Sequence, residues 1–302
     1  VLDSRKTLTV AETTIVSDGA SLRLEGGSLA SGQLVLDGPG ATLTASSGTL
    51  DVDELVATAG ATFTIDAGQI VSINNRVTVD ASSTLVLAGG TLNVPEVIDN
   101  GGAVDFSSGT LHLSGSDLAV GAGGLLGDIL TLDASRILDI SGVVTLDAAG
   151  AVTIDGGSLS AASIGNNGGA FELVAGALHL TGSDLEIDAD GLLGADLSLT
   201  PGKSLVVDGT VTIRQNGTLT MASGELTAEA LVVKGPQATL TLNGPAPTVT
   251  DFSLLNGAQQ QLTTGQSLVV AATTQVAAGT VLQLAGGSLT TGTLLVDGGF
   301  TF

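Results

Sequence analysis

Apolar and polar residues alternate in short stretches along the whole chain, and pairs containing glycine separate the stretches. Residues 205–221 show this well, because Leu205-Val206-Val207, Val211-Thr212-Ile213 and Leu219-Thr220-Met221 are separated by Asp-Gly and Asn-Gly. Alternation with period two buries one face of a strand, and such pairs supply the positive φ of tight turns. Glycine and β-branched residues interrupt every helical window. The pattern therefore predicts an all-β chain of strands of about four residues joined by turns.

One unit of sequence occurs five times. Gly26-Gly27-Ser28-Leu29 returns at 89–92, 156–159, 223–226 and 286–289, so its leucine recurs after 63, 67, 67 and 63 residues (92 − 29, 159 − 92, 226 − 159, 289 − 226). The copies cover 7–69, 70–136, 137–203, 204–266 and a truncated 267–302, after a lead-in at 1–6. Copies two and three share an insertion, at 115–127 and 182–194, for which we expect a longer side loop. We expect residues 1–302 to form a single domain.

A finer period of about twenty residues divides each copy into three coils. Strands this short are unstable alone or as hairpins, so each coil must stack on its neighbours in parallel register. The sequence thus predicts a parallel β-helix, or β-solenoid, of about 14 coils of about 20 residues grouped in threes, and this coil length favours a right-handed helix. One column of inward pairs stays aliphatic from copy to copy: Leu22/Leu24, Leu85/Leu87, Val152/Ile154, Leu219/Met221 and Leu282/Leu284.

Composition narrows the classes of partner. The 302 residues include 44 glycines and no cysteine, tryptophan or tyrosine, so the core must be built from small aliphatic side chains. Eight basic and 30 acidic residues give a net charge of −22, which repels phosphate backbones and anionic lipid surfaces. No apolar run approaches the ~18 residues of a spanning helix. We therefore expect neither nucleic-acid binding nor membrane insertion.

Two runs resemble a known group of proteins. Residues 286–298, Gly-Gly-Ser-Leu-Thr-Thr-Gly-Thr-Leu-Leu-Val-Asp-Gly, and the related run at 32–44 look like the β-strand repeats of bacterial secreted surface proteins, in particular autotransporter passengers and large adhesins. The resemblance covers nearly the whole chain. It implies a parallel β-helix exported to the cell surface, and it implies no catalytic residues. The translocator barrel of full-length autotransporters is not part of this sequence, which leaves the secretion route open.

Acidic residues in copy three form the candidate metal site. Oxygen-rich acidic loops are what calcium prefers, and four carboxylates flank Gly191: Asp184, Asp188, Asp190 and Asp196. Copy two has Gly121 and Gly123 in place of Asp188 and Asp190, so the repeat folds without those ligands. Neither known calcium-loop pattern is present. Our main expectation is therefore a protein without a cofactor, and calcium is the alternative.

The two histidines occupy the same outward position of neighbouring copies. His112 and His179 lie 67 residues apart (179 − 112). Three coils at the sheet spacing would separate them by about 14 Å, which is too far for one metal ion. We expect two surface histidines.

Three functions are compatible with these patterns. The first is a non-enzymatic secreted rod or filament subunit at a bacterial cell surface. Such a subunit would assemble head to tail because the chain starts in the repeat and stops inside copy five without a cap-like helix. Phe300 and Phe302 would be buried by the neighbouring molecule.

The second function is that of an adhesin passenger, which binds a glycan or a receptor through the loops at 115–127, 182–194 and 244–247. The third is a polysaccharide-active enzyme, whose carboxylate pair would arise from stacking.

Overall fold

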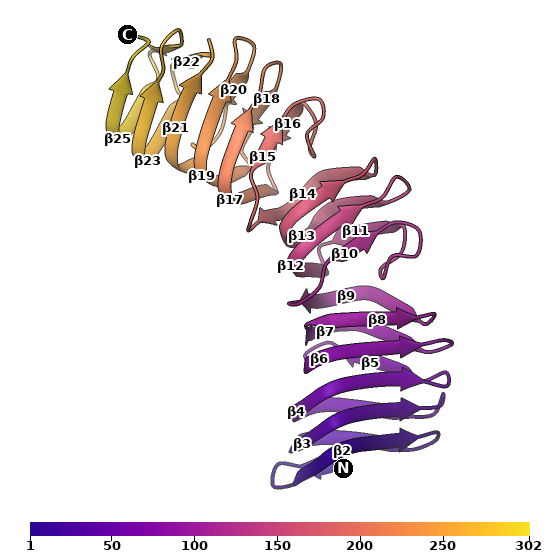
Figure 1. Cartoon of the computed structure of the whole chain (residues 1–302). Coiled ribbons are helices and arrows are strands. Elements are labelled where there is room, and N and C mark those ends of the chain that lie inside the picture. Colours follow the sequence, from indigo (N-terminus) through magenta and orange to yellow (C-terminus); the bar gives the residue numbers. More distant parts are fainter. The chain divides into compact units, whose positions relative to one another are not determined.

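A computed structural model describes residues 1–302 with the exception of Ser46. The described residues contain no helix, and parallel strands stack on one another as a β-solenoid of about 14 turns (Figure 1). The predicted fold class is confirmed. The hand of the helix stays a prediction.

Internal contacts divide the chain into two compact units, each of which is described by itself. The first comprises residues 1–152 and 165–170, and the second comprises residues 153–164 and 171–302. That residues 1–302 form one domain stays a prediction.

The first unit contains the strands β1 (Leu2–Asp3), β2 (Thr7–Ser17), β3 (Ser21–Asp37), β4 (Thr42–Thr58), β5 (Thr62–Asp66), β6 (Ile70–Asp80), β7 (Thr84–Val94), β8 (Glu96–Asn100), β9 (Ala103–Leu113), β10 (Leu118–Val120), β11 (Ile129–Asp133) and β12 (Arg136–Leu146). Within it, β2 pairs with β3, β3 with β4, β4 with β6 and β6 with β8, all in parallel (Figure 1).

The second unit contains most of β13 (Ala151–Asn166) and β14 (Ala170–Leu180), and all of β15 (Leu185–Ile187), β16 (Asp196–Leu199), β17 (Lys203–Ile213), β18 (Thr218–Met221), β19 (Glu225–Lys234), β20 (Thr239–Leu242), β21 (Thr248–Leu255), β22 (Gln259–Thr263), β23 (Ser267–Val276), β24 (Val281–Ala285), β25 (Ser288–Val296) and β26 (Gly299–Thr301). Here β17, β19, β21, β23 and β25 pair in that order, again in parallel (Figure 1).

Many strands are longer than the predicted four residues, because several corners stay inside the hydrogen-bonded ladder, whereas β16, β18 and β20 have four residues each. β3 has 17 residues, and its pairing with β4 shifts register between Glu25 and Ser28, where the chain turns. Gly26 makes the turn with φ +94°, a value that favours glycine, and Leu29 then enters the core fully buried. Gly-Gly-Ser-Leu is thus a corner followed by an inward leucine.

The core is built from columns of aliphatic side chains, one residue from each coil. The predicted inward residues Leu85 and Leu87 are fully buried, whereas Val86 between them is not. In the first unit, the column that includes Leu29 contains Leu8, Leu29 and Leu50, and Val71 is paired in the same way with Leu92, Leu111 and Leu138; the second unit has Leu178, Leu205 and Leu226, and Leu268 with Leu289. We call this set the leucine column.

The insertion of copies two and three lengthens one coil. Leu8 pairs with Leu29, 21 positions later (29 − 8), but Leu111 pairs with Leu138, 27 positions later (138 − 111). The inserted segment is not loop throughout, because β10 pairs with β12 and buries Leu118 and Val120. Within the predicted side loop of copy two, the residues outside the strands are 115–117 and 121–127.

Candidate functional sites

The first candidate site is the open edge of β2. β2 pairs with β3 on one side only, and its side chains Leu8 and Ile15 are exposed. The backbone N–H of Ser28 donates to the carbonyl of Lys6 at 3.0 Å. Because successive residues of a strand point their backbone groups to opposite sides, Thr7 and Thr9 direct theirs out of the open edge. Such an edge is a template for pairing with another strand.

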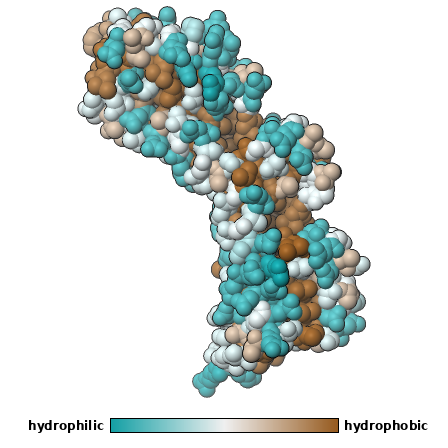
Figure 2. Space-filling view, viewed as in Figure 1, coloured by the Kyte–Doolittle hydropathy of each residue, from teal (hydrophilic) through white to brown (hydrophobic). Residues whose placement is uncertain are grey.

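The second open edge is formed by β25 and β26. β25 pairs with β23, and β26 pairs with β24, each on one side only. Leu294, Leu295 and Val296 are all exposed on this last coil. Figure 2 shows apolar side chains gathered beside the C-terminal end of the chain. Residues 288–296 include no charged side chain in a chain with 30 acidic residues.

The predicted self-association residues lie at this second edge. Phe300 is half-buried and stands opposite Leu282 in the pairing of β26 with β24, and Phe302 is 90% exposed. The two rings meet edge to face, with centroids 5.1 Å apart and an interplanar angle of 90°. The ring of Phe302 thus remains mostly exposed to solvent at the end of the second unit.

Asp184, one of the calcium candidates, accepts a hydrogen bond from the backbone of the next coil. Its Oδ1 accepts the N–H of Thr210 at 2.8 Å, at the register shift between β17 and β19. Asp117 and Asp251, 67 residues before and after it (184 − 117, 251 − 184), accept the N–H groups of Val143 and Thr273 in the same way, at 2.8 Å and 3.0 Å. One carboxylate in each of these copies therefore satisfies the backbone donor that a register shift leaves unpaired. This role was missed from the sequence.

The other three calcium candidates are not assembled into a site. Asp188 accepts the N–H of Asp190 at 3.0 Å and lies 3.6 Å from Nε of Arg214. Asp190 and Asp196 are exposed. The described residues contain no group of three or more His, Cys, Asp or Glu side chains that could hold a metal ion.

Each histidine is paired with a carboxylate of the following coil. Nδ1 of His112 lies 2.7 Å from Oδ2 of Asp139, and Nε2 of His179 lies 2.9 Å from Oδ1 of Asp208. Both imidazoles are about one third exposed, so they are surface residues with a partner. Asp139 and Asp208 are not equivalent positions of the repeat, so no repeated spacing in the sequence signals these pairs.

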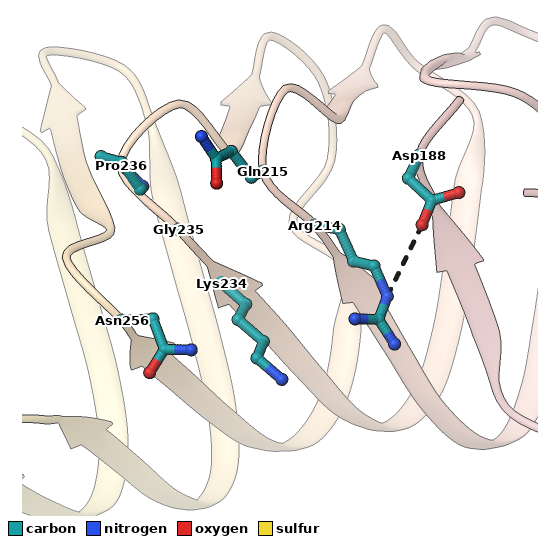
Figure 3. A pocket seen from close by; sticks show the side chains of 7 residues that line it. All are labelled: Asp188, Arg214, Gln215, Lys234, Gly235, Pro236 and Asn256. Carbon is teal, nitrogen blue, oxygen red and sulfur yellow. Dashed lines mark ion pairs between the residues drawn. The ribbon is translucent and has the colours of Figure 1, made fainter. Parts of the chain in front are cut away.

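A polar cleft lies on the second unit, beside the turn that follows β15. Its lining residues come from four successive coils and are drawn in Figure 3: Asp188, Arg214, Gln215, Lys234, Gly235, Pro236 and Asn256. In Figure 3 the ammonium group of Lys234 lies between Asn256 and Arg214. Lys234 makes no ion pair with any described residue, whereas Arg214 pairs with Asp188 and Glu186.

Arg214 forms an ion pair with Glu186 beside this cleft. Its guanidinium hydrogen-bonds the carboxylate of Glu186, which lowers the pKa of Glu186 below its ordinary value. The same bond raises the pKa of Arg214. Both groups are charged at neutral pH. The charge of Lys234 also lowers the pKa of Glu186, but Lys234 makes no ion pair with a described residue, so it is the cation of the cleft that can pair with an added anionic group.

Comparisons with known proteins identified no relative of this chain. No family model, no curated protein and no solved structure matches the chain. The described part of the chain also contains no helix long and apolar enough to cross a membrane. The class that the fold defines is therefore the parallel β-solenoid repeat protein.

Proposed function

We propose that this chain is a non-enzymatic structural subunit that associates end to end into longer rods. The observation that carries the proposal is the pair of open edges, one on β2 and one on β25 and β26. Natural proteins protect such edges with charged side chains, proline or a covering segment. β2 has Glu12 as its one charged residue, β25 has none, and neither strand contains proline.

The expected partner is a second copy of the chain, joined head to tail. The two edges are different surfaces. β2 pairs with β3, which follows it in the chain, whereas β25 pairs with β23, which precedes it. A contact between two different surfaces repeats without closing, so it produces a fibre.

Sedimentation velocity and negative-stain electron microscopy test this proposal. The purified chain is expected to form rods whose length grows with concentration in the micromolar range. Thr9→Pro removes a backbone donor at the open edge and should abolish the growth, because the missing N–H points away from β3. Thr9→Val keeps the donor and is the matched control. A wild-type chain that stays monomeric at all these concentrations would falsify the proposal.

We place the rod at a bacterial cell surface. The support is the resemblance of residues 286–298 and 32–44 to repeats of secreted surface proteins. A chain without cysteine also folds without any dependence on the redox state of its compartment. Fractionation of the producing cells, with detection of the chain by antibody before and after surface proteolysis, tests this location. Detection in the cytosol alone would refute it.

A second candidate function is favoured by the polar cleft. An adhesin passenger would use the turns at 182–194, which contribute Asp188 to the cleft, and Lys234 would pair with a carboxylate or sulfate of an acidic glycan. Binding of the wild type and of Lys234→Ala to immobilised uronic-acid polymers tests this function, with Lys203→Ala as the control because Lys203 also makes no ion pair with a described residue. Equal binding by all three proteins would exclude the cleft.

A further inference from the structure

The two cations of the polar cleft are neighbours on successive coils. Ile213 pairs with Val233 in the parallel ladder of β17 and β19, and Arg214 and Lys234 are the residues that follow them. Neighbouring strands lie ~4.8 Å apart, so the two side chains start from adjacent points of the surface. Figure 3 shows them extending in the same direction. An anionic group between their ends can therefore contact both cations at once.

The guanidinium of Arg214 is already engaged by carboxylates of the chain itself. Its Nη2 donates a hydrogen bond to Oε1 of Glu186, and its Nε lies 3.6 Å from Oδ2 of Asp188. Nε is buried and has no hydrogen-bond partner, although it is a donor. The side chains of Arg214 and Glu186 are 41% and 46% exposed. Ion pairs this exposed contribute little stability, so Glu186 can be exchanged for another anion at low cost.

Glu186 acts on both cations. The hydrogen bond from Arg214 lowers the pKa of Glu186, and the charge of Lys234 lowers it further. Attraction between charges is mutual, so the carboxylate of Glu186 in turn weakens the attraction of Lys234 for a second anion. The charged groups around Glu186 are Arg214 on β17, Lys234 on β19 and Asp188 in the turn that follows β15.

We infer that Glu186 is an internal competitor for the anionic group that the cleft binds. While its carboxylate holds Arg214, only Lys234 is open to the ligand. When the ligand displaces this carboxylate, Arg214 and Lys234 together bind one carboxylate or sulfate of an acidic glycan. Glu186 thus limits the affinity of the cleft. This inference rests on the second candidate function proposed above.

Removal of the competing charge tests the inference. Binding of dextran sulfate and of a uronic-acid polymer is measured by surface plasmon resonance for the wild type, Glu186→Gln and Glu229→Gln. Glu229 is exposed, does not line the cleft and makes no ion pair with a described residue, so Glu229→Gln removes the same charge elsewhere. Glu186→Gln should bind one or both polymers several-fold more tightly than the wild type. Equal affinities of the two variants would overturn the inference.

A double-mutant cycle separates competition from a general effect of charge. Arg214→Ala removes the group for which Glu186 and the ligand compete. Adding Glu186→Gln to Arg214→Ala should therefore bring no further gain in affinity. A gain of the same size without Arg214 would overturn the inference, because Glu186 would then act only by repelling the ligand.

The pH profile is a further measurement that a merely structural role of Glu186 would not change. Glu186 is charged above the ordinary glutamate value of 4.5 and takes up a proton as the pH falls through its lowered pKa. Sulfate groups stay charged over this range. With dextran sulfate, the ratio of the affinity of Glu186→Gln to that of the wild type should therefore fall as the pH is lowered from about 7 to about 3. A constant ratio would contradict competition by the carboxylate.

Failure of the underlying function gives a different result. If the wild type, Glu186→Gln and Lys234→Ala all bind each polymer equally, the cleft is not a glycan site. Loss of binding in Lys234→Ala without a gain in Glu186→Gln would refute the competition alone. Circular dichroism of each variant, at each pH used, confirms that it is folded.

Discussion

Residues 28–36 and 288–296 are the same part of the repeat, but only the first is buried. Leu34 is 0% exposed and its equivalent Leu294 is 39% exposed; Leu36 is 0% exposed and Val296 is 43% exposed. Both segments rest on the preceding coil in the same register. The difference is that β4 covers β3, whereas no described strand covers β25. In a solenoid the core of one coil is therefore completed by the next coil, and burial depends on position in the stack as well as on sequence.

The largest expected effect is the difference in stability between alanine variants of the two segments. Leu34→Ala should lower the free energy of unfolding by about 2–5 kcal/mol, because it leaves a cavity between two coils. Leu294→Ala should cost less than about 1 kcal/mol in the dilute monomer, since its side chain is already partly in water. Urea denaturation of both variants at low protein concentration measures the difference. Equal losses of free energy would show that β25 is as well covered as β3.

The next effect concerns assembly and ionic strength. Long-range repulsion between chains of charge −22 is screened by salt, and the edges contain few charges that salt could weaken. Rods should therefore form several-fold faster at about 150 mM than at about 15 mM sodium chloride. Light scattering against time measures this rate. Slower growth at higher salt would mean that ion pairs hold the edges together.

A smaller effect compares the corners of the copies. Ser223 has φ +79° where the other copies have Gly26, Gly89, Gly156 and Gly286, all with positive φ. Ser223→Gly should raise the free energy of unfolding by about 1 kcal/mol, because a residue with a Cβ is strained in this conformation. Ser28→Gly, in the extended part of the first corner, is the control and should be destabilising. A Ser223→Gly variant less stable than the wild type would contradict this explanation.

The smallest effect concerns the ion pair of the second unit. The pKa of Glu186 is lowered by Arg214, so the pair contributes its full stability above the ordinary glutamate value of 4.5 and loses it as the pH falls through the lowered pKa. Because both side chains are partly exposed, Glu186→Gln should be only slightly less stable than the wild type at pH 7. Urea midpoints measured from pH 7 to pH 3 should converge at the acid end. A constant gap would assign the difference to packing.

The sequence was sufficient for the features that recur in every coil. Period-two alternation placed Leu85 and Leu87 in the core, and Gly26 marked the corner because positive φ favours glycine. The coil stack followed from these, since strands so short need neighbours. The predicted length was too short for strands such as β3, because a corner that keeps its ladder hydrogen bonds cannot be distinguished from a turn by composition.

Contacts between side chains of neighbouring coils could not be predicted from the repeat pattern. The bond from Thr210 to Asp184 joins residues 26 apart (210 − 184), and this offset is set by a coil that the insertion lengthens. The cleft around Lys234 likewise gathers residues from four successive coils. Acidic residues near Gly191 suggested calcium from their composition, whereas the structure assigns Asp184 to the backbone of the next coil. The repeated spacing of Asp117, Asp184 and Asp251 was the signal that could have revealed this role.

The division of each copy into complete coils also bears on how such a chain can change in length. Duplication or loss of a 63- or 67-residue segment of the gene would add or remove three whole turns, and the residues on both open edges would be unchanged. Under the end-to-end association proposed above, chains of different length would remain able to join one another. Selection could then adjust the length of one subunit without changing the strands through which the proposed contact is made.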